Sequence, residues 1–223
     1  NNVKIYLSWY KYNYHHIAIK DAINELDGIS VIWDRSFEGN AASKYMTVSD
    51  VMFRSSLWGL KNDKLNGNQI PYNVCVGLLR DYGKDILKIE ANKIRNNLIS
   101  NGAKKIVTVF DQASVGEYEH KIQRENYKNI LEVMIKTPWL GLIFKPKKAK
   151  DIYFRLGEEV TYLLDLAIKT GRCKIYDSYG LYQSNTPAIL AALSSDVCIH
   201  AHLYAGTAAV ESALCGIPTL LID

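Results

Sequence analysis

Residues 196–223, DVCIHAHLYAGTAAVESALCGIPTLLID, decide the fold. The apolar residues 197–199 predict a buried strand, and Thr207 is a candidate N-cap for the helix that follows. The Gly-Ile-Pro sequence at 216–218 is typical of a helix end, and residues 219–222 predict a second strand. Because a strand, a helix and a strand follow one another at this spacing, we interpret the stretch as a β-α-β unit of a parallel sheet.

The start of this predicted helix offers a site for an anion. The amides of Gly206, Thr207 and Ala208 have no earlier carbonyl to bond and lie at the positive end of the helix macrodipole. Glu211, one turn into the helix, could accept hydrogen bonds from a ribose diol. The plainer alternative is that every β-α-β turn needs small residues and that Glu211 is a solvated helix carboxylate. Both interpretations stay open at this point.

Residues 205–223, AGTAAVESALCGIPTLLID, resemble the donor-nucleotide segment of GT-B glycosyltransferases. That family has a small-residue turn, a helix with a ribose-binding Glu, a Gly-x-Pro sequence and a strand, so the resemblance implies a ribose contact for Glu211. Residues 194–196, SSD, resemble the helix end that precedes this segment. The same pattern occurs in teichoic-acid polymerases, capsule transferases and non-hydrolysing sugar-nucleotide epimerases. It therefore indicates a fold and a type of donor rather than one reaction.

The resemblance extends toward the N-terminus. Residues 48–59, VSDVMFRSSLWG, and 74–83, VCVGLLRDYG, are similar to the domain junction of capsule and teichoic-acid transferases. Gly77 and Arg80 match the Gly-x-Pro-Arg pattern, whereas Leu79 stands where the family often has Pro. Residues 143–148, IFKPKK, resemble a strand that ends in Lys-Pro-His-Pro, with a lysine in place of the histidine.

The composition is that of a globular protein. The chain has 223 residues, of which 48% are hydrophobic and 22% charged, so it can bury a core. A net charge of +4 suits anionic substrates or an anionic membrane surface, and it is too small to predict nucleic-acid binding. No apolar run approaches the ~20 residues of a membrane span. We expect a cytoplasmic protein, with peripheral association at the inner face of the membrane left open.

Cysteine usage points to the same compartment. The four cysteines are far apart in the sequence, and most of them lie in apolar patterns, so we expect buried free thiols and a reducing compartment. They are Cys75, Cys173, Cys198 and Cys215.

Strand and helix patterns alternate along the chain. From Lys105 onward, five predicted strands with crossover helices would form one parallel sheet. We therefore predict an α/β protein with two Rossmann-like, doubly wound parallel-sheet domains in the GT-B arrangement. Residues 1–79 would be part of an acceptor-side domain, 80–104 a junction and connecting helix, and 105–223 the donor domain. Both ends are expected to be incomplete, and residues 61–69 are expected to form a turn-rich connection.

Ligands of open α/β sheets bind beyond the carboxyl ends of the strands, so polar residues there are the candidates. In such a donor site, Lys145 or Arg80 would offset the charge of the diphosphate. Ser114, after Asp111, would hold the second phosphate or the sugar. Asp177 would lie near the nucleobase. Each position also has a plainer explanation as a capped turn, a solvated lysine run or a pocket lining. The predicted set is Arg80, Ser114, Lys145, Asp177, His200, His202, Gly206, Thr207, Ala208 and Glu211.

A transferase also needs a general base for the acceptor hydroxyl. The candidates lie in the first part of the chain and are His15, His16 and Asp34. His200 and His202 alternate along a strand and could share a metal, but no third ligand is evident, and we predict none. The chain contains no Asp-x-Asp, GxGxxG, Walker loop or GxSxG, which argues against a metal-dependent transferase, a dehydrogenase, an ATPase and a serine hydrolase.

The leading hypothesis is a metal-independent glycosyltransferase. It would move a sugar or sugar-phosphate group from a nucleotide-sugar donor to a surface polysaccharide. The acceptor would be a glycan or a lipid-linked molecule. We expect no other cofactor and no binding of nucleic acid. Two alternatives stay open. One is a non-hydrolysing sugar-nucleotide epimerase of the same fold, and the other is a non-catalytic domain that binds a nucleotide.

Overall fold

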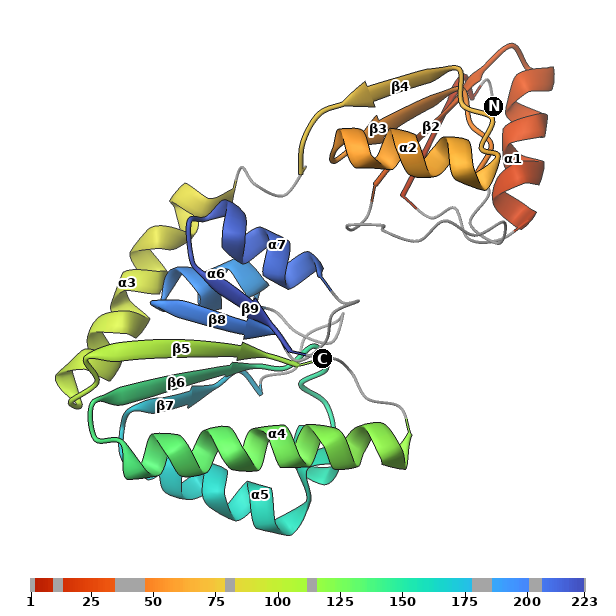
Figure 1. Ribbon diagram of the computed structural model, residues 1–223. Helices are drawn as coiled ribbons and strands as arrows, with labels where there is room; N and C mark the ends of the chain where they lie inside the picture. The colour runs from red at the N-terminus through yellow and green to blue at the C-terminus, as the bar shows by residue number, and fades with distance from the viewer. Residues whose placement is uncertain are drawn as a thin grey trace. The chain divides into compact units, whose positions relative to one another are not determined.

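The computed structural model (Figure 1) describes residues 3–9, 14–34, 47–78, 83–111, 116–177, 186–200 and 206–222. The chain divides into two compact units, Asn1–Arg80 and Asp81–Asp223. The first unit has a four-stranded parallel sheet and the second a five-stranded one. With seven helices among the described residues, the fold is α/β and consistent with a Rossmann-like architecture, so the predicted α/β class and the two parallel sheets are confirmed. Of the two described sheets, only the second has the reversed strand order of a doubly wound fold.

The first unit is a run of parallel strands joined in sequence order. The strands pair as β1-β2-β3-β4, all parallel. Its elements are β1 (Ile5–Ser8), α1 (Tyr14–Glu25), β2 (Ile29–Trp33), β3 (Val51–Arg54), α2 (Leu57–Asn66) and β4 (Tyr72–Cys75).

The expected turn-rich connection at 61–69 is wrong, because α2 continues to Asn66. Gly67 ends this helix in the left-handed conformation, with φ 72°, where its amide bonds back to the carbonyls of Asp63 and Lys64. The Asn-Gly pair is thus a helix stop and not a turn inside a loop. The apolar side chains of Leu57, Trp58 and Leu65 in α2 are exposed. Asp63 instead ties the helix to the sheet through an ion pair with Arg54.

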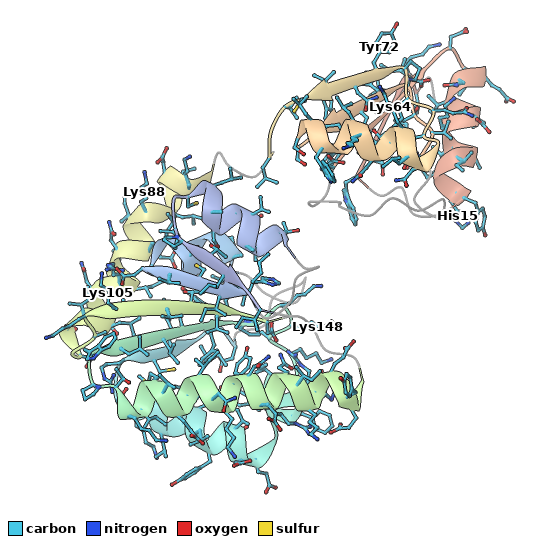
Figure 2. All side chains as sticks on the ribbon, in the orientation of Figure 1. His15, Lys64, Tyr72, Lys88, Lys105 and Lys148 are labelled. Atoms are coloured by element: carbon cyan, nitrogen blue, oxygen red, sulfur yellow. The ribbon has the colours of Figure 1, made fainter. Side chains whose placement is uncertain are left out.

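Both described helices of this unit contact one face of its sheet. His16 of α1 lies against Tyr6, with ring centroids 6.0 Å apart, and α2 contacts Arg54. Side chains alternate between the two faces of a strand, so the neighbours of Tyr6 point the other way. That second face carries exposed apolar side chains, among them Ile5, Leu7, Ile29, Val74 and Tyr72. Tyr72 is labelled in Figure 2.

The second unit has the strand order β7-β6-β5-β8-β9, all parallel. The five strands predicted from Lys105 onward therefore form one parallel sheet. The order reverses between β5 and β8, which makes their carboxyl ends the switch point of a doubly wound sheet. The elements are α3 (Lys84–Ser100), β5 (Lys105–Phe110), α4 (Glu117–Lys136), β6 (Leu140–Lys145), α5 (Ile152–Lys169), β7 (Cys173–Ile175), α6 (Ala188–Leu193), β8 (Val197–His200), α7 (Thr207–Leu214) and β9 (Thr219–Leu221).

Helices cover both faces of this sheet and bury two cores. Figure 1 shows α4 and α5 on one side and α3, α6 and α7 on the other. Tyr127, Leu131 and Phe144 belong to the core under α4 and α5, whereas Ile106 and Phe110 belong to the core under α3 and α6. Such burial on both faces explains why the strands of the second unit read as nearly continuous apolar runs.

Asp196 joins the start of two neighbouring strands to a helix. Its carboxylate accepts the amide of Ile106 at 2.8 Å and the guanidinium of Arg95 on α3 at 2.9 Å. Partial burial favours the neutral carboxyl, but these two hydrogen bonds outweigh it and hold the pKa of Asp196 below its ordinary value. The residue thus fixes the amino ends of β5 and β8 side by side, at the opposite end of these strands from the switch point.

Candidate functional site

The carboxyl edge at the switch point brings two predicted residues into one row. Lys145 and His200 are both register partners of Phe110, on either side of it. Register partners in a parallel sheet point to the same face, and strands lie about 4.8 Å apart, so Lys145 and His200 have their Cα atoms roughly 10 Å apart. Lys145 is 6% exposed and His200 is 2% exposed. The row therefore places two nitrogen-bearing side chains, both withdrawn from solvent, beside the switch point.

Lys145 is held in a shielded position. Its Nζ donates to the carbonyl of Pro146 at 3.2 Å. Burial lowers the pKa of the Lys145 ammonium below its ordinary value, while the negative charge of Asp111 acts in the opposite direction. The lysine run at 145–150 is thus not a uniform solvated surface, because its first member is buried and Lys147 is exposed.

Asp111, directly after β5, is the centre of a buried polar cluster. Its carboxylate accepts Gln123 Nε2 of α4 at 2.6 Å, Arg155 Nη1 of α5 at 3.1 Å and the backbone amide of Lys147. Burial raises the pKa of the Asp111 carboxyl, and the Lys147 amide, Arg155 and Gln123 counteract that shift. The cluster joins the ends of β5 and β6 to both helices on that face.

Sequence reasoning missed Arg155 and Gln123. Arg155 is 5% exposed and Gln123 is 7% exposed, although both lie in helices whose pattern looks amphipathic. One signal was available, since Arg155 is a charged residue between Phe154 and Leu156 in an apolar stretch. A buried arginine needs an acid partner, and only the fold shows that Asp111 supplies it.

The start of α7 lies where the β-α-β pattern placed it. Gly206, and not Thr207, occupies the N-cap position, with φ −60° and ψ −6°, and Thr207 is the first helical residue. The prediction of Thr207 as the N-cap is therefore wrong, and the N-cap residue makes no side-chain hydrogen bond to the helix. Ala208 packs on the core under α3 and α6.

Glu211 lies on the buried side of α7. It is 7% exposed, and the neighbouring Ser212 is fully buried. The alternative of a solvated helix carboxylate is thus excluded for Glu211. A carboxylate largely removed from water needs defined hydrogen-bond donors for its oxygens.

Of the remaining donor-site candidates, the structure describes Asp177. Asp177, after β7, accepts the Tyr153 hydroxyl of α5 at 2.6 Å. Arg80, Ser114 and His202 lie outside the described residues, so their predicted roles stay predictions.

The three candidate bases all belong to the first unit and have different surroundings. His15 is exposed and stacks on Tyr14, with ring centroids 4.1 Å apart. His16 is buried, and its Nε2 lies 3.0 Å from the carbonyl oxygen of Val48. Asp34 is half-buried with its side chain only 6% exposed, and it accepts Arg54 Nη1 at 2.8 Å and the amide of Ser55 at 2.9 Å. His15 is therefore the candidate base that solvent reaches most easily.

Within the described ranges, no group of three or more His, Cys, Asp or Glu residues could hold a metal ion. In the same part of the chain, no helix is long and apolar enough to span a membrane. A comparison with known protein families finds no matching family model, and a comparison with curated proteins finds no significant match.

Proposed function

We propose that the second unit binds a nucleotide-activated sugar and that the chain is a metal-independent glycosyltransferase of GT-B type. It would move a sugar or sugar-phosphate group to a surface polysaccharide acceptor, and the first unit would serve the acceptor side. The observation that carries this proposal is the burial of Glu211, one turn into the helix that follows β8 at the switch point. The GT-B resemblance implies a ribose contact at this position, and ligands of doubly wound sheets bind at the switch point.

The proposed chemistry uses charge and dipoles in place of a metal. The amides at 206–208 would receive the donor diphosphate at the positive end of α7. Lys145, two strands away along the same edge, would offset the charge of the nucleotide as it leaves. His200, between these two groups, would contact a phosphate or the sugar.

One observation favours the non-catalytic alternative. Two of the three candidate bases, His16 and Asp34, have side chains shielded from solvent and are already engaged with Val48 and Arg54. A general base must reach the proton that it removes, so neither is in a state to act without a rearrangement. A chain with the donor site and without a working base would bind the nucleotide and not transfer its sugar.

Nucleotide binding tests the donor site directly. Thermal unfolding of the chain is measured with UDP, CMP, CDP and GDP, each with and without EDTA. A ligand at 100 times its Kd stabilises the folded state by about 2.7 kcal/mol, which such a measurement resolves. Glu211→Gln should abolish the shift, whereas the matched control Glu158→Gln, an exposed residue of α5, should retain it.

The outcomes separate the three functions. A shift that survives EDTA and depends on Glu211 supports a metal-independent donor site, and no shift with any nucleotide contradicts it. If the site exists, product analysis with the donor alone identifies an epimerase, because only that enzyme changes the sugar without an acceptor. Binding without any turnover, with or without acceptor, identifies the non-catalytic domain.

A further inference from the structure

The segment after β6 is held through its backbone by two buried side chains. Asp111 accepts the amide of Lys147, and Arg155 Nη2 donates to the carbonyl of Lys148 at 2.6 Å. Lys148 is labelled in Figure 2 at the carboxyl edge of the sheet. The chain is therefore fixed within three residues of Lys145, the last residue of the strand.

Arg155 can reach this segment because α5 is not one continuous helix. Gly157 has φ 73° and ψ 174°, which separates the first turn of α5 from the rest of the helix. A non-glycine residue would be strained at this φ. Arg124 of α4 donates to the carbonyl of Arg155 at 2.8 Å and fixes that turn from outside. The first turn of α5 is thus oriented independently of the rest of the helix and positions the Arg155 guanidinium.

The same cluster acts on Lys145 electrostatically. Arg155, Lys145, Lys147 and Lys148 outnumber Asp111, the acid of this cluster, so these groups together carry a positive charge. Among these groups, Asp111 is the one whose charge favours the ammonium form of Lys145 and opposes the effect of its burial. Asp111 therefore affects Lys145 in two ways, through its hydrogen bond to the Lys147 amide and through its negative charge.

We propose that Asp111 and Arg155 are positioning residues that hold Lys145 for the terminal phosphate of a nucleoside diphosphate. The inference rests on the proposed donor site. It explains why that site would bind a nucleoside diphosphate more tightly than a nucleoside monophosphate. The nucleoside end would be bound at α7 by Glu211, and the phosphate farthest from the ribose would be bound by Lys145. Asp111 itself touches no part of the ligand.

The test compares diphosphates with monophosphates on the full chain. Calorimetric titration gives Kd for UDP against UMP, CDP against CMP and GDP against GMP, in wild type, Asp111→Asn and the control Asp165→Asn, which changes an exposed residue of α5. Asp111→Asn should weaken the diphosphate about tenfold, the value of one hydrogen bond to a charged group, and leave the monophosphate nearly unchanged. The control should change neither.

A double variant shows whether Asp111 acts through Lys145. Lys145→Met should remove the diphosphate preference, and Asp111→Asn added to it should cause no further loss, because the two residues act as one unit. Should Asp111→Asn fail to fold, Arg155→Lys carries the same test, since it keeps the charge and loses the second guanidinium contact to Lys148.

Each result has a definite meaning. Equal weakening of both nucleotides by Asp111→Asn, no weakening, or additive losses in the double variant would overturn the positioning role while the donor site stands. If the wild-type protein binds none of the six nucleotides, the donor site itself is wrong, and the positioning role is wrong with it.

Discussion

The buried ion-pair cluster of the first unit leads to a sharp prediction about stability. Arg54 ends β3 and is 2% exposed. Its Nη1 lies 2.8 Å from Asp34 Oδ1, and its Nη2 pairs with the carboxylate of Asp63 on α2. Its Nε donates to Asn73 on β4 at 3.4 Å. Arg54→Met keeps much of the side-chain length and leaves two buried carboxylates without their cation.

We expect Arg54→Met to lower the free energy of unfolding of the first unit by about 3–5 kcal/mol, the range for removing one partner of a buried ion pair. The upper part of this range applies, because two carboxylates lose the same cation. Domains are stable by only about 5–15 kcal/mol, so this loss would bring the unit close to unfolding. Replacing Asp34 and Asp63 by Asn in the same variant removes the buried charges and should recover much of the loss.

Urea unfolding followed by tryptophan fluorescence measures this loss, because three of the four tryptophans, Trp9, Trp33 and Trp58, lie in the first unit. The control Lys128→Met removes an exposed partner of Glu159 in the second unit and should leave the urea midpoint nearly unchanged. A loss below about 1 kcal/mol for Arg54→Met, the value of an exposed pair, would refute the buried-charge reasoning. So would a triple variant no more stable than the single one.

Two further predictions concern thiols and acid. Burial raises the pKa of Cys173 to about 12 and that of Cys198 to about 11, so a thiol reagent at pH 8 should modify the exposed Cys75 first, and Cys75→Ser should remove the fast phase; a fast phase that remains would contradict the assigned burial. Asp196 has a lower pKa in the folded state than its ordinary value of 3.8, so it stabilises the protein above that value and loses this effect as the pH falls through the folded pKa. Asp196→Asn should therefore cost about 1 kcal/mol at pH 7, seen in the urea midpoint, and a difference that stayed constant down to pH 2 would refute this account.

Much of the fold could be predicted because the decisive signals are local. Apolar β-branched runs such as Lys105–Phe110 and helix stops such as Gly216 mark the elements of the second unit in the sequence itself. The helix α2 escaped prediction because its stability comes from a distant contact, the pair between Asp63 and Arg54, and not from an apolar stripe.

The candidate site was only partly predictable for a related reason. Lys145 and His200 could be chosen because they end apolar strands, and the carboxyl ends of strands are where ligands bind. Arg155 could not, since its role depends on a break in α5 at Gly157 that brings its guanidinium to Asp111. A glycine inside a helical pattern predicts a weak point, but not which side chain uses it.

The exposed apolar face of the first sheet has a consequence for the order of unfolding. Side chains such as Ile5 and Leu7 are 62% and 57% exposed, so they keep more than half of their contact with water in the folded state. Their hydration contributes little to the heat-capacity change of unfolding and little to its driving force. On heating, the first unit should therefore melt before the second and with a smaller heat-capacity step per residue, which calorimetry would show as two separate transitions.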